Sequence, residues 1–403
     1  MTTLIAECKD QVLECAACVN QDKLIICYLK DVKNLLYVHD LSTGDRLHTI
    51  PLEIGSVTRF SVDKRYSEWF YTFNSTIIPS VSYRVDMTKS PPDVQVFRET
   101  KIPDFDRSHY KFKQVFYNSK DGTRIPMFIT SRKDCKRDGT EPCMLYGYGG
   151  FNISLSPSFA EKQLFFVQHY GYYAIANIRG GGEYGEKWHN AGRLLNKQNC
   201  FDDFIAAAEF LVAKKYTCKE KLALQGDSNG GLLVGACLNQ RPDLFGAGIA
   251  GVGVMDMLRF HKFTIGYAWS SDFGNPDRKE DFENIMKYSP LHTIPSGDQQ
   301  YPATLLTTSD HDDRVVPSHS LKFIAELQHK FGAHSGQKNP LLIRVETKAG
   351  HGQGKPMSKV IEESADVLAF LTEALHYHYK ELPSNQACCP WGCHGNPRVC
   401  QIS

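Results

Sequence analysis

The stretch that decides the fold is LALQGDSNGGLLVGACLNQ, residues 222–240. Its opening apolar residues predict a short strand, and residues 230–240 have the apolar spacing of a helix that stops at Arg241-Pro242. Between them lies the GxSxG motif of residues 226–230. Glycines two residues before and after a serine allow a sharp strand-to-helix turn that exposes the hydroxyl. The pattern therefore predicts a nucleophile at Ser228. The alternative is a glycine-rich turn with a helix-capping serine.

Strand and helix patterns alternate on both sides of this segment. Continuous apolar stretches predict buried strands at 142–150, 172–178, 222–226, 247–254, 303–310 and 341–346. Helical apolar spacing covers 200–214, 319–331 and 358–379. Buried strands that alternate with helices indicate a mostly parallel sheet covered on both faces. The longest apolar stretch, 244–255, is too short and too rich in glycine to span a bilayer.

A nucleophilic serine of this kind needs an acid and then a histidine later in the chain. An acidic cluster, residues 310–313, follows one predicted strand, and His351 follows another. Both would lie at the carboxyl ends of parallel strands, where open sheets place their sites. The order Ser, Asp, His therefore fits. A metal site or a helix cap is the alternative for the acidic cluster, and a surface loop residue is the alternative for His351.

A second glycine-rich motif matches the pattern of a nucleotide-binding site. Residues 180–185, GGGEYG, match GxGxxG after a predicted strand, with acidic residues 202 and 203 about 20 positions on. However, Glu183 would place a negative charge against a pyrophosphate, and the next helix begins late. We therefore do not expect nucleotide binding.

The first hundred residues read as short strands, at 24–28, 35–41, 69–73 and 81–87. The first and third begin 45 residues apart, within the period of about 40–50 residues that is typical of four-stranded propeller blades. Residues 115–131 then predict a hairpin that turns at Asp121-Gly122. The chain is thus β-rich first and α/β afterwards.

Composition excludes several classes of function. The 403 residues carry 46 Lys and Arg against 45 Asp and Glu, so no basic arm suggests a nucleic-acid partner. The first residues lack the pattern of a secretory signal. Thirteen cysteines are present, nine of them scattered as small buried thiols would be. Cys15 and Cys18 form only half of a zinc site, so we expect no metal.

Longer runs give the chain a family resemblance. It resembles the prolyl oligopeptidase family, cytosolic serine endopeptidases of the S9 type, from about residue 11 to 380. The runs that carry the likeness are 120–128, 145–152, 176–189, 197–204, 228–234, 239–246, 252–266, 310–317 and 347–356. The resemblance implies an α/β hydrolase domain with a doubly wound, mostly parallel sheet over 104–383. It also implies a partial β-propeller of about two blades over 1–103, leaving 384–403 as a tail outside the family pattern.

The resemblance also implies roles for particular residues. Ser228 would be the nucleophile, His351 the general base and Asp312 the carboxylate that orients it; the choice of Asp312 rests on motif alignment. The oxyanion hole would comprise the hydroxyl of Tyr148 and the backbone N–H of Asn229. Arg314 would hold a peptide carbonyl. An apolar proline pocket would be lined by Phe151, Val254, Trp269, Phe273 and Val315.

The implied activity is hydrolysis of short peptides on the carboxyl side of proline through an acyl-enzyme. The expected protein is a cytoplasmic monomer without cofactor or metal and without nucleic acid as a partner. Two alternatives stay open: a catalytically impaired fragment that acts only through interactions, and an α/β-hydrolase esterase. One assay with prolyl amides and acyl esters distinguishes them.

Three departures from the family pattern affect these expectations. Asp227 stands where the family usually has glycine, so a bulky carboxylate lies at the strained turn. Phe273 replaces a tyrosine of the pocket wall. Third, only about two propeller blades precede the hydrolase domain, whereas the family carries seven. Two blades alone would expose strand edges, so we expect poor solubility or an unfolded first hundred residues. We also expect weakened activity and loss of the filter that restricts substrates to short peptides.

The tail ends in Cys400-Gln-Ile-Ser403, which fits a C-a-a-X prenylation signal. Cys388, Cys389 and Cys393 could supply a second lipid signal, so membrane anchoring would depend on Cys400. The alternative is an unmodified tail without function.

Overall fold

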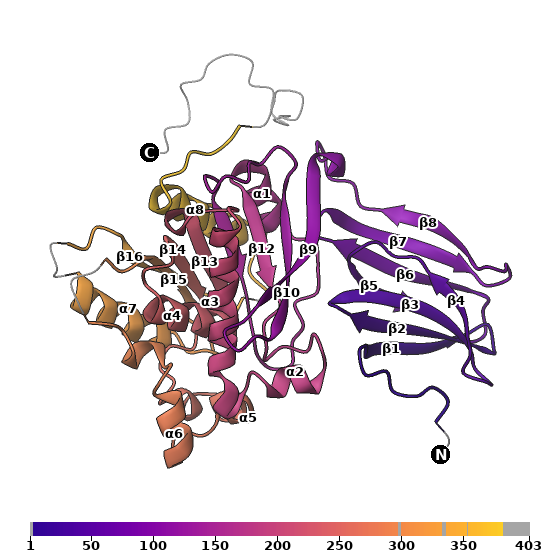
Figure 1. Ribbon diagram of the computed structural model, residues 1–403, viewed down its shortest axis with the longest axis horizontal. Coiled ribbons are helices and arrows are strands. Elements are labelled where there is room, and N and C mark those ends of the chain that lie inside the picture. The colour runs from indigo at the N-terminus through magenta and orange to yellow at the C-terminus, as the bar shows by residue number, and fades with distance from the viewer. Residues whose placement is uncertain (1–2, 297–299, 333–335, 353, 382–403) are drawn as a thin grey trace.

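The computed structural model describes residues 3–296, 300–332, 336–352 and 354–381 (Figure 1). The strands of these residues form two four-stranded sheets and one sheet of eight strands. Cys388, Cys389, Cys393 and Cys400 lie outside the described residues, and so does the predicted prenylation site.

The two small sheets are antiparallel, and each follows the order of the chain. The first comprises β1 (Val12–Val19), β2 (Lys23–Lys30), β3 (Lys33–Asp40) and β4 (Arg46–Ile50). The second comprises β5 (Ser56–Ser61), β6 (Glu68–Ser75), β7 (Ile78–Asp86) and β8 (Asp93–Glu99). Each sheet has the form of one propeller blade, as the 45-residue spacing predicts.

A shared core joins these two sheets. Alternate residues of β6, among them Trp69, Tyr71 and Phe73, are buried together with Leu36 and Val38 of β3. Because the apolar faces of the two sheets cover each other, the expectation of an unfolded first hundred residues is wrong for this structure.

The large sheet has the order β16-β15-β14-β13-β11-β12-β10-β9. The antiparallel hairpin β9 (Tyr110–Asn118) and β10 (Arg124–Arg132) forms one edge, and β10 is antiparallel to β12. The other neighbours are parallel: β11 (Cys143–Tyr146), β12 (Tyr172–Ala176), β13 (Leu222–Asp227), β14 (Ala247–Gly251), β15 (Ala303–Ser309) and β16 (Leu341–Glu346). The carboxyl ends of β13, β15 and β16 therefore open at the same edge.

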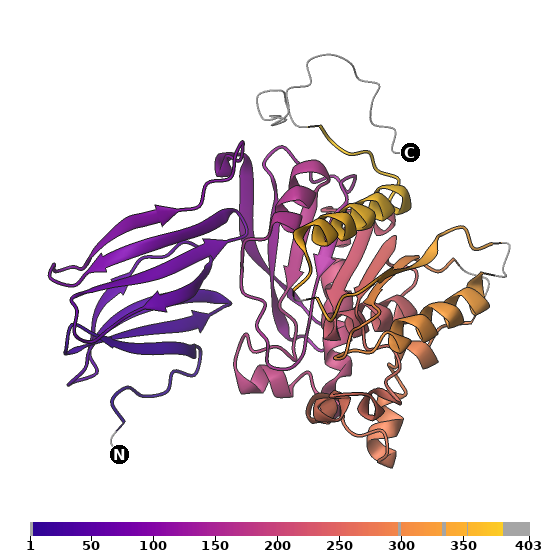
Figure 2. The ribbon, with the colours of Figure 1, turned by 180° about the vertical axis from the view of Figure 1, so that it is seen from behind.

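Helices cover both faces of this sheet. One core contains buried side chains of α3 (Gln198–Ala213), α4 (Asn229–Gln240) and α7 (Ser318–Phe331). The other contains those of α1 (Glu161–His169) and α8 (Met357–Ala374), and Figure 2 shows α8 in yellow crossing that face. Among the described residues no helix has the length and apolar character to cross a bilayer.

Short helical segments complete the chain. They are η1 (Arg107–His109), α2 (Glu186–Asn190), η2 (Leu194–Asn196), η3 (Lys219–Lys221), η4 (Phe260–Lys262), η5 (Gly266–Trp269), α5 (Ser270–Phe273), α6 (Lys279–Ile285) and η6 (Pro290–His292).

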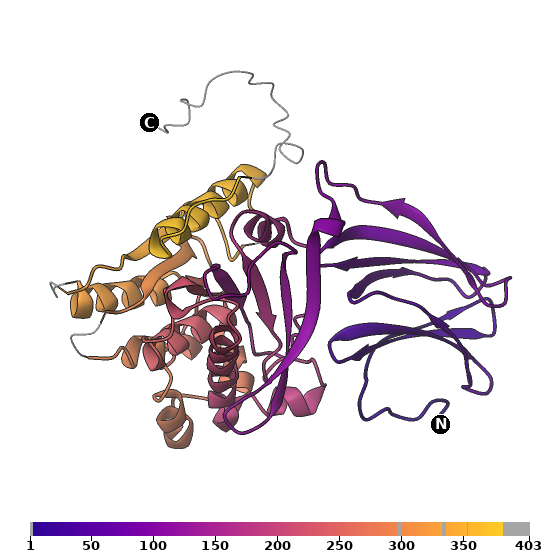
Figure 3. The same cartoon turned by 45° about the horizontal axis from the view of Figure 1, so that its top comes forward.

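The small sheets contact the large one on the side of β9, as Figure 3 shows. The turn between β2 and β3 makes two of these contacts. The backbone carbonyl of Asp31 accepts a hydrogen bond from Gln114 of β9 at 2.6 Å, and its carboxylate accepts one from Tyr184 at 2.9 Å. Ser56 donates to the carbonyl of Pro157 at 2.7 Å.

Candidate active site

Ser228 lies at the sharp turn between β13 and α4. Its backbone angles are φ +59° and ψ −115°, a conformation that non-glycine residues rarely adopt and that costs about 1–3 kcal/mol. The flanking glycines make the turn possible. A Cβ on Gly226 would lie 2.4 Å from the carbonyl oxygen of Gly230, and one on Gly230 would lie 2.7 Å from that of Gly147. The GxSxG motif therefore forms a strained elbow that presents a half-buried serine.

His351 and Asp312 meet at the same edge of the sheet. The Nδ1 atom of His351 lies 2.6 Å from Oδ2 of Asp312, whose side chain is fully buried. The other oxygen, Oδ1, accepts hydrogen bonds from the backbone N–H groups of Arg314 and Val315, both at 2.9 Å. These contacts fix the orientation of the carboxylate.

The other acids of the cluster do not take this position. Asp310 contacts its exposed neighbour His311 at 2.6 Å, and Asp313 is exposed. Of the acids at 310–313, Asp312 is thus the one that contacts His351. Within the described residues no hydrogen bond joins Ser228 to His351, and contacts of this kind often tighten only when substrate binds.

Tyr148 follows β11 and faces Ser228. Burial raises the pKa of its phenol, and the nearby charge of Asp272 raises it further. The charge of Arg314 and a hydrogen bond with Ser228 oppose this shift in the pKa without reversing it. The phenol therefore keeps its proton at neutral pH and can donate it. Asn229 begins α4, so its backbone N–H has no acceptor within the helix.

An apolar wall stands beside these polar groups. The rings of Phe151 and Phe273 meet edge to face with centroids 5.4 Å apart. Phe260, which was not predicted from sequence, lies between Phe273 and Trp269, with centroids 5.3 Å and 6.3 Å away. Val254 and Val315 are buried in the same core. Ring contacts thus link Phe151, Phe273 and Trp269, and all five predicted pocket residues belong to the main core of the large sheet or pack against it.

Arg314 differs from the other predicted residues in being exposed. Within the described part of the chain, its guanidinium makes no ion pair, whereas its backbone N–H is bound by Asp312. The guanidinium is thus available to a ligand.

Comparison with known proteins identifies the family. The profile of the prolyl oligopeptidase family matches residues 157–378, and the profile of the N-terminal β-propeller domain of prolyl oligopeptidase matches residues 1–98. The chain belongs to the prolyl oligopeptidase family. Its first hundred residues accordingly form part of a propeller, and the eight-stranded sheet with its covering helices forms an α/β hydrolase domain.

Individual relatives agree with this assignment. The chain is 47% identical to the prolyl endopeptidase of Dictyostelium discoideum over 371 residues, which cover 91% of this chain and 48% of the relative. It is 46% identical to that of Elizabethkingia meningoseptica over 345 residues, covering 85% of this chain and 48% of the relative. The chain spans about half the length of the curated relatives it matches.

Solved structures match over the same extent. Prolyl oligopeptidase B from Galerina marginata, bound to a 35mer hydrolysis and macrocyclization substrate, superposes with a TM-score of 0.89 at 40% identity, covering 94% of this chain and 52% of that one. A post-proline cleaving enzyme from Rickettsia typhi gives 0.81 at 29% identity, covering 93% and 53%.

The turn that carries Ser228 has room for Asp227 because a glycine, Gly251, lies opposite its side chain. A Cβ on Gly251 would lie 2.1 Å from Oδ1 of Asp227, so the carboxyl occupies the space that Gly251 leaves. The side chain reaches solvent, but surrounding protein removes part of its hydration and raises the pKa of the carboxyl. Tyr146 lies 3.5 Å away.

The glycine-rich segment at 180–185 supports the loop that carries Tyr148. Asn152 donates its backbone N–H to Gly180 at 3.2 Å, and a Cβ on Gly180 would lie 2.5 Å from the oxygen of Gly149. Glu183 is buried and accepts the backbone N–H of Leu155 at 3.0 Å. The glycines therefore serve close packing of two loops.

Sequence reasoning missed three ionisable residues around the Tyr148 loop. Asp272 accepts the backbone N–H of Phe151 at 2.8 Å and contacts His189 at 2.6 Å. Lys197 donates to the carbonyl of Gly149 at 2.8 Å. His189 and Lys197 lie within the runs that carry the resemblance, which was the available signal for them.

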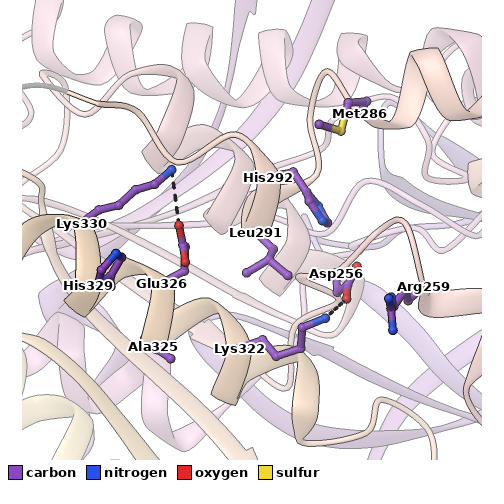
Figure 4. Close-up of a pocket in the computed structure, with 10 residues that line it drawn as sticks. All are labelled: Asp256, Arg259, Met286, Leu291, His292, Lys322, Ala325, Glu326, His329 and Lys330. Carbon is purple, nitrogen blue, oxygen red and sulfur yellow. Dashed lines mark hydrogen bonds and ion pairs between the residues drawn. The ribbon is translucent and has the colours of Figure 1, made fainter.

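A polar cavity of about 950 Å³ lies apart from this site (Figure 4). Its lining comes from α7, η6, the segment after β14 and Met286, which follows α6, and it contains none of the predicted site residues. Charged groups in it pair with one another: Lys322 with Asp256, and Lys330 with Glu326 at 3.6 Å.

Proposed function

We propose that the chain is a serine endopeptidase that cleaves short peptides on the carboxyl side of proline. The observation that carries this proposal is the contact between His351 and a fully buried, hydrogen-bonded Asp312 beside the strained elbow of Ser228. Family membership and relatives named prolyl endopeptidase support it. We further propose domain boundaries at 1–103, 104–383 and 384–403.

In the first step, Ser228 attacks the carbonyl carbon of the proline residue, whose amide bond to the next residue is the one cleaved. Asp312 accepts a hydrogen bond from Nδ1–H of His351, which leaves the lone pair of Nε2 free to take the hydroxyl proton. His351 then gives that proton to the departing amine as the C–N bond breaks. Water, activated by the same imidazole, hydrolyses the acyl-enzyme and restores the serine.

The negative charge on the substrate oxygen would be stabilised by two donors. They are the phenol of Tyr148, whose raised pKa keeps it protonated, and the free backbone N–H of Asn229. In comparable enzymes, removal of one such donor costs about 2.7–4 kcal/mol of transition-state stabilisation.

Selectivity for proline would come from shape. The proline ring has no charge and no donor, so the rings of Phe151, Trp269 and Phe273 can bind it only by apolar contact. Arg314, exposed and beside Tyr148, can donate hydrogen bonds to a carbonyl of the bound peptide.

Hydrolysis of three substrates by the purified chain tests this function. They are a peptidyl-prolyl amide, the matching alanyl amide and a small acyl ester. We expect cleavage of the prolyl amide well above the alanyl amide, and loss of cleavage in Ser228→Ala. Cleavage of the ester alone would indicate an esterase, and a folded chain that cleaves none would indicate an interaction fragment.

A further inference from the structure

Lys197 is a charged residue in the protein core. It precedes α3 directly, and the residue is 1% exposed. In the described part of the chain, no carboxylate lies within ion-pair distance of its Nζ atom. Burial of an amine without a carboxylate is costly unless its hydrogens find acceptors. The hydrogen-bond acceptors of Lys197 therefore determine how the buried amine is stabilised.

Both acceptors lie in or next to a residue of the predicted oxyanion hole. Nζ donates to the carbonyl oxygen of Gly149 at 2.8 Å and to Oδ1 of Asn229 at 3.3 Å. It also lies 5.3 Å from the centroid of the Phe273 ring, on the wall of the proposed proline pocket. Lys197 thus touches the residue that follows Tyr148 and the side chain of Asn229.

The side chain of Asn229 closes a ring of hydrogen bonds. Its Nδ2 donates to the carbonyl oxygen of Tyr148 at 2.5 Å. The amine of Lys197 can only donate hydrogen bonds, so the atom of Asn229 that faces it must be the amide oxygen. The amide nitrogen of Asn229 then faces the carbonyl of Tyr148. Gly150 makes room, since a Cβ there would lie 2.6 Å from that Nδ2 atom.

The loop held by these bonds has an uncommon backbone. Gly149, Phe151 and Asn152 all have positive φ, at +66°, +55° and +57°. Two non-glycine residues in this region store strain that surrounding contacts must hold. Lys197 binds the loop at its start, on the carbonyl between Tyr148 and Phe151.

We propose that Lys197 is a positioning residue of the oxyanion hole: by holding Gly149 and the amide of Asn229, it sets the spacing between the Tyr148 hydroxyl and the Asn229 backbone N–H. This inference rests on the proposed function. It assigns Lys197 a role that matters when the substrate oxygen becomes an oxyanion, and little role in ground-state binding.

The test compares the parent chain of residues 1–403 with Lys197→Met and Lys197→Gln. Methionine keeps the length and removes every donor, whereas glutamine retains an uncharged donor and keeps the test available if methionine impairs folding. Lys221→Met is the matched control, because Lys221 also donates to a backbone carbonyl, that of Thr140 at 2.9 Å, but on the surface. Each variant is assayed for kcat and KM on a prolyl amide.

Two inhibitors separate positioning from a general structural effect. A peptide aldehyde ending in proline forms an oxyanion with the serine, whereas the matching alcohol cannot. We expect Lys197→Met to lower kcat and aldehyde affinity roughly 10- to 100-fold, with KM and alcohol affinity nearly unchanged. Lys221→Met should match the parent.

Three results would overturn the inference. In the first, the parent and both Lys197 variants bind the aldehyde equally. In the second, each Lys197 variant loses aldehyde and alcohol affinity to the same degree, which indicates a distorted pocket. In the third, the parent does not cleave the prolyl amide, and then the proposed function falls together with the inference.

Discussion

The Nε2 atom of His189 lies 2.6 Å from Oδ1 of Asp272, a residue 83 positions further along the chain. The Asp272 side chain is almost completely buried, and its second oxygen accepts the backbone N–H of Phe151 at 2.8 Å. The pair thus ties the proposed proline pocket to α2, the short helix that follows the glycine-rich segment. Asp272 holds the Tyr148 loop at Phe151, and Lys197 holds it at Gly149.

Replacement of Asp272 by alanine should therefore weaken substrate binding. The Phe151 N–H would lose its acceptor and His189 its partner, so the ring of Phe151 would leave the pocket wall. We expect KM for a prolyl amide to rise about tenfold and the unfolding free energy to fall by about 3 kcal/mol, since one member of a buried pair is removed. Steady-state kinetics and urea unfolding measure both quantities.

Asp272→Asn serves as the matched variant because its amide oxygen can still accept the Phe151 N–H. Its KM should lie between those of the parent and of Asp272→Ala. Equal KM values for the parent and the alanine variant would show that the contact does not support the pocket.

A second prediction concerns the carboxyl of Asp227. Surrounding protein removes part of its hydration, and this raises the pKa of the carboxyl above its ordinary value of 3.8. The folded state therefore disfavours the ionised form, and the stability that this group contributes is lost as pH rises above that value. Asp227→Asn does not titrate and is nearly constant in size, so the parent should lose stability relative to the variant as pH rises, as measured by urea unfolding. A stability difference that does not change with pH would contradict this prediction.

How far the sequence predicts this structure depends on the range of the interactions involved. The elbow at Ser228 was predictable because its sharp turn is local: Gly226 leaves room for the carbonyl of Gly230 within the same five residues, whereas the contact of Gly230 with Gly147 appears only in the folded chain. Strands β13 to β16 were predictable because each is a continuous apolar stretch. Strand β8, whose side chains are mostly exposed, has no such pattern and was missed.

The polar contacts of the site could not be predicted from local sequence patterns. Three acids within residues 310–313 are equivalent in pattern. They differ in the folded chain because the backbone N–H groups of Arg314 and Val315 donate to one oxygen of Asp312, and the other oxygen contacts His351. Lys197 and Asp272 act on loops 48 and 121 residues away, so only the folded chain shows what they contact.

A third prediction is a pH dependence of stability that originates at Glu183. Burial raises the pKa of its carboxyl from 4.5 to about 7, and its Oε2 atom is buried without a hydrogen-bond partner among the described residues. Between these two values the folded state keeps a proton that the unfolded state releases. Stability contributed by this group is therefore lost as pH rises through that window, by up to about 3 kcal/mol.

Urea unfolding of the parent and of Glu183→Gln at pH 5 and pH 7.5 measures this effect. Glutamine does not titrate, so the parent should lose stability relative to the variant as pH rises. Glu186→Gln, an exposed change three residues on, should show no such trend. A constant difference between the parent and Glu183→Gln would contradict the prediction.

The most direct test of the central claim, that Ser228 is a nucleophile activated by His351 and Asp312, is covalent labelling with a fluorophosphonate. The site of the adduct is mapped by peptide mass spectrometry. The account predicts one adduct on Ser228, no labelling of Ser228→Ala, and labelling of Asp312→Asn and His351→Ala slowed by at least about a hundredfold. A folded parent that stays unlabelled, or an adduct on another residue that survives in Ser228→Ala, would contradict it.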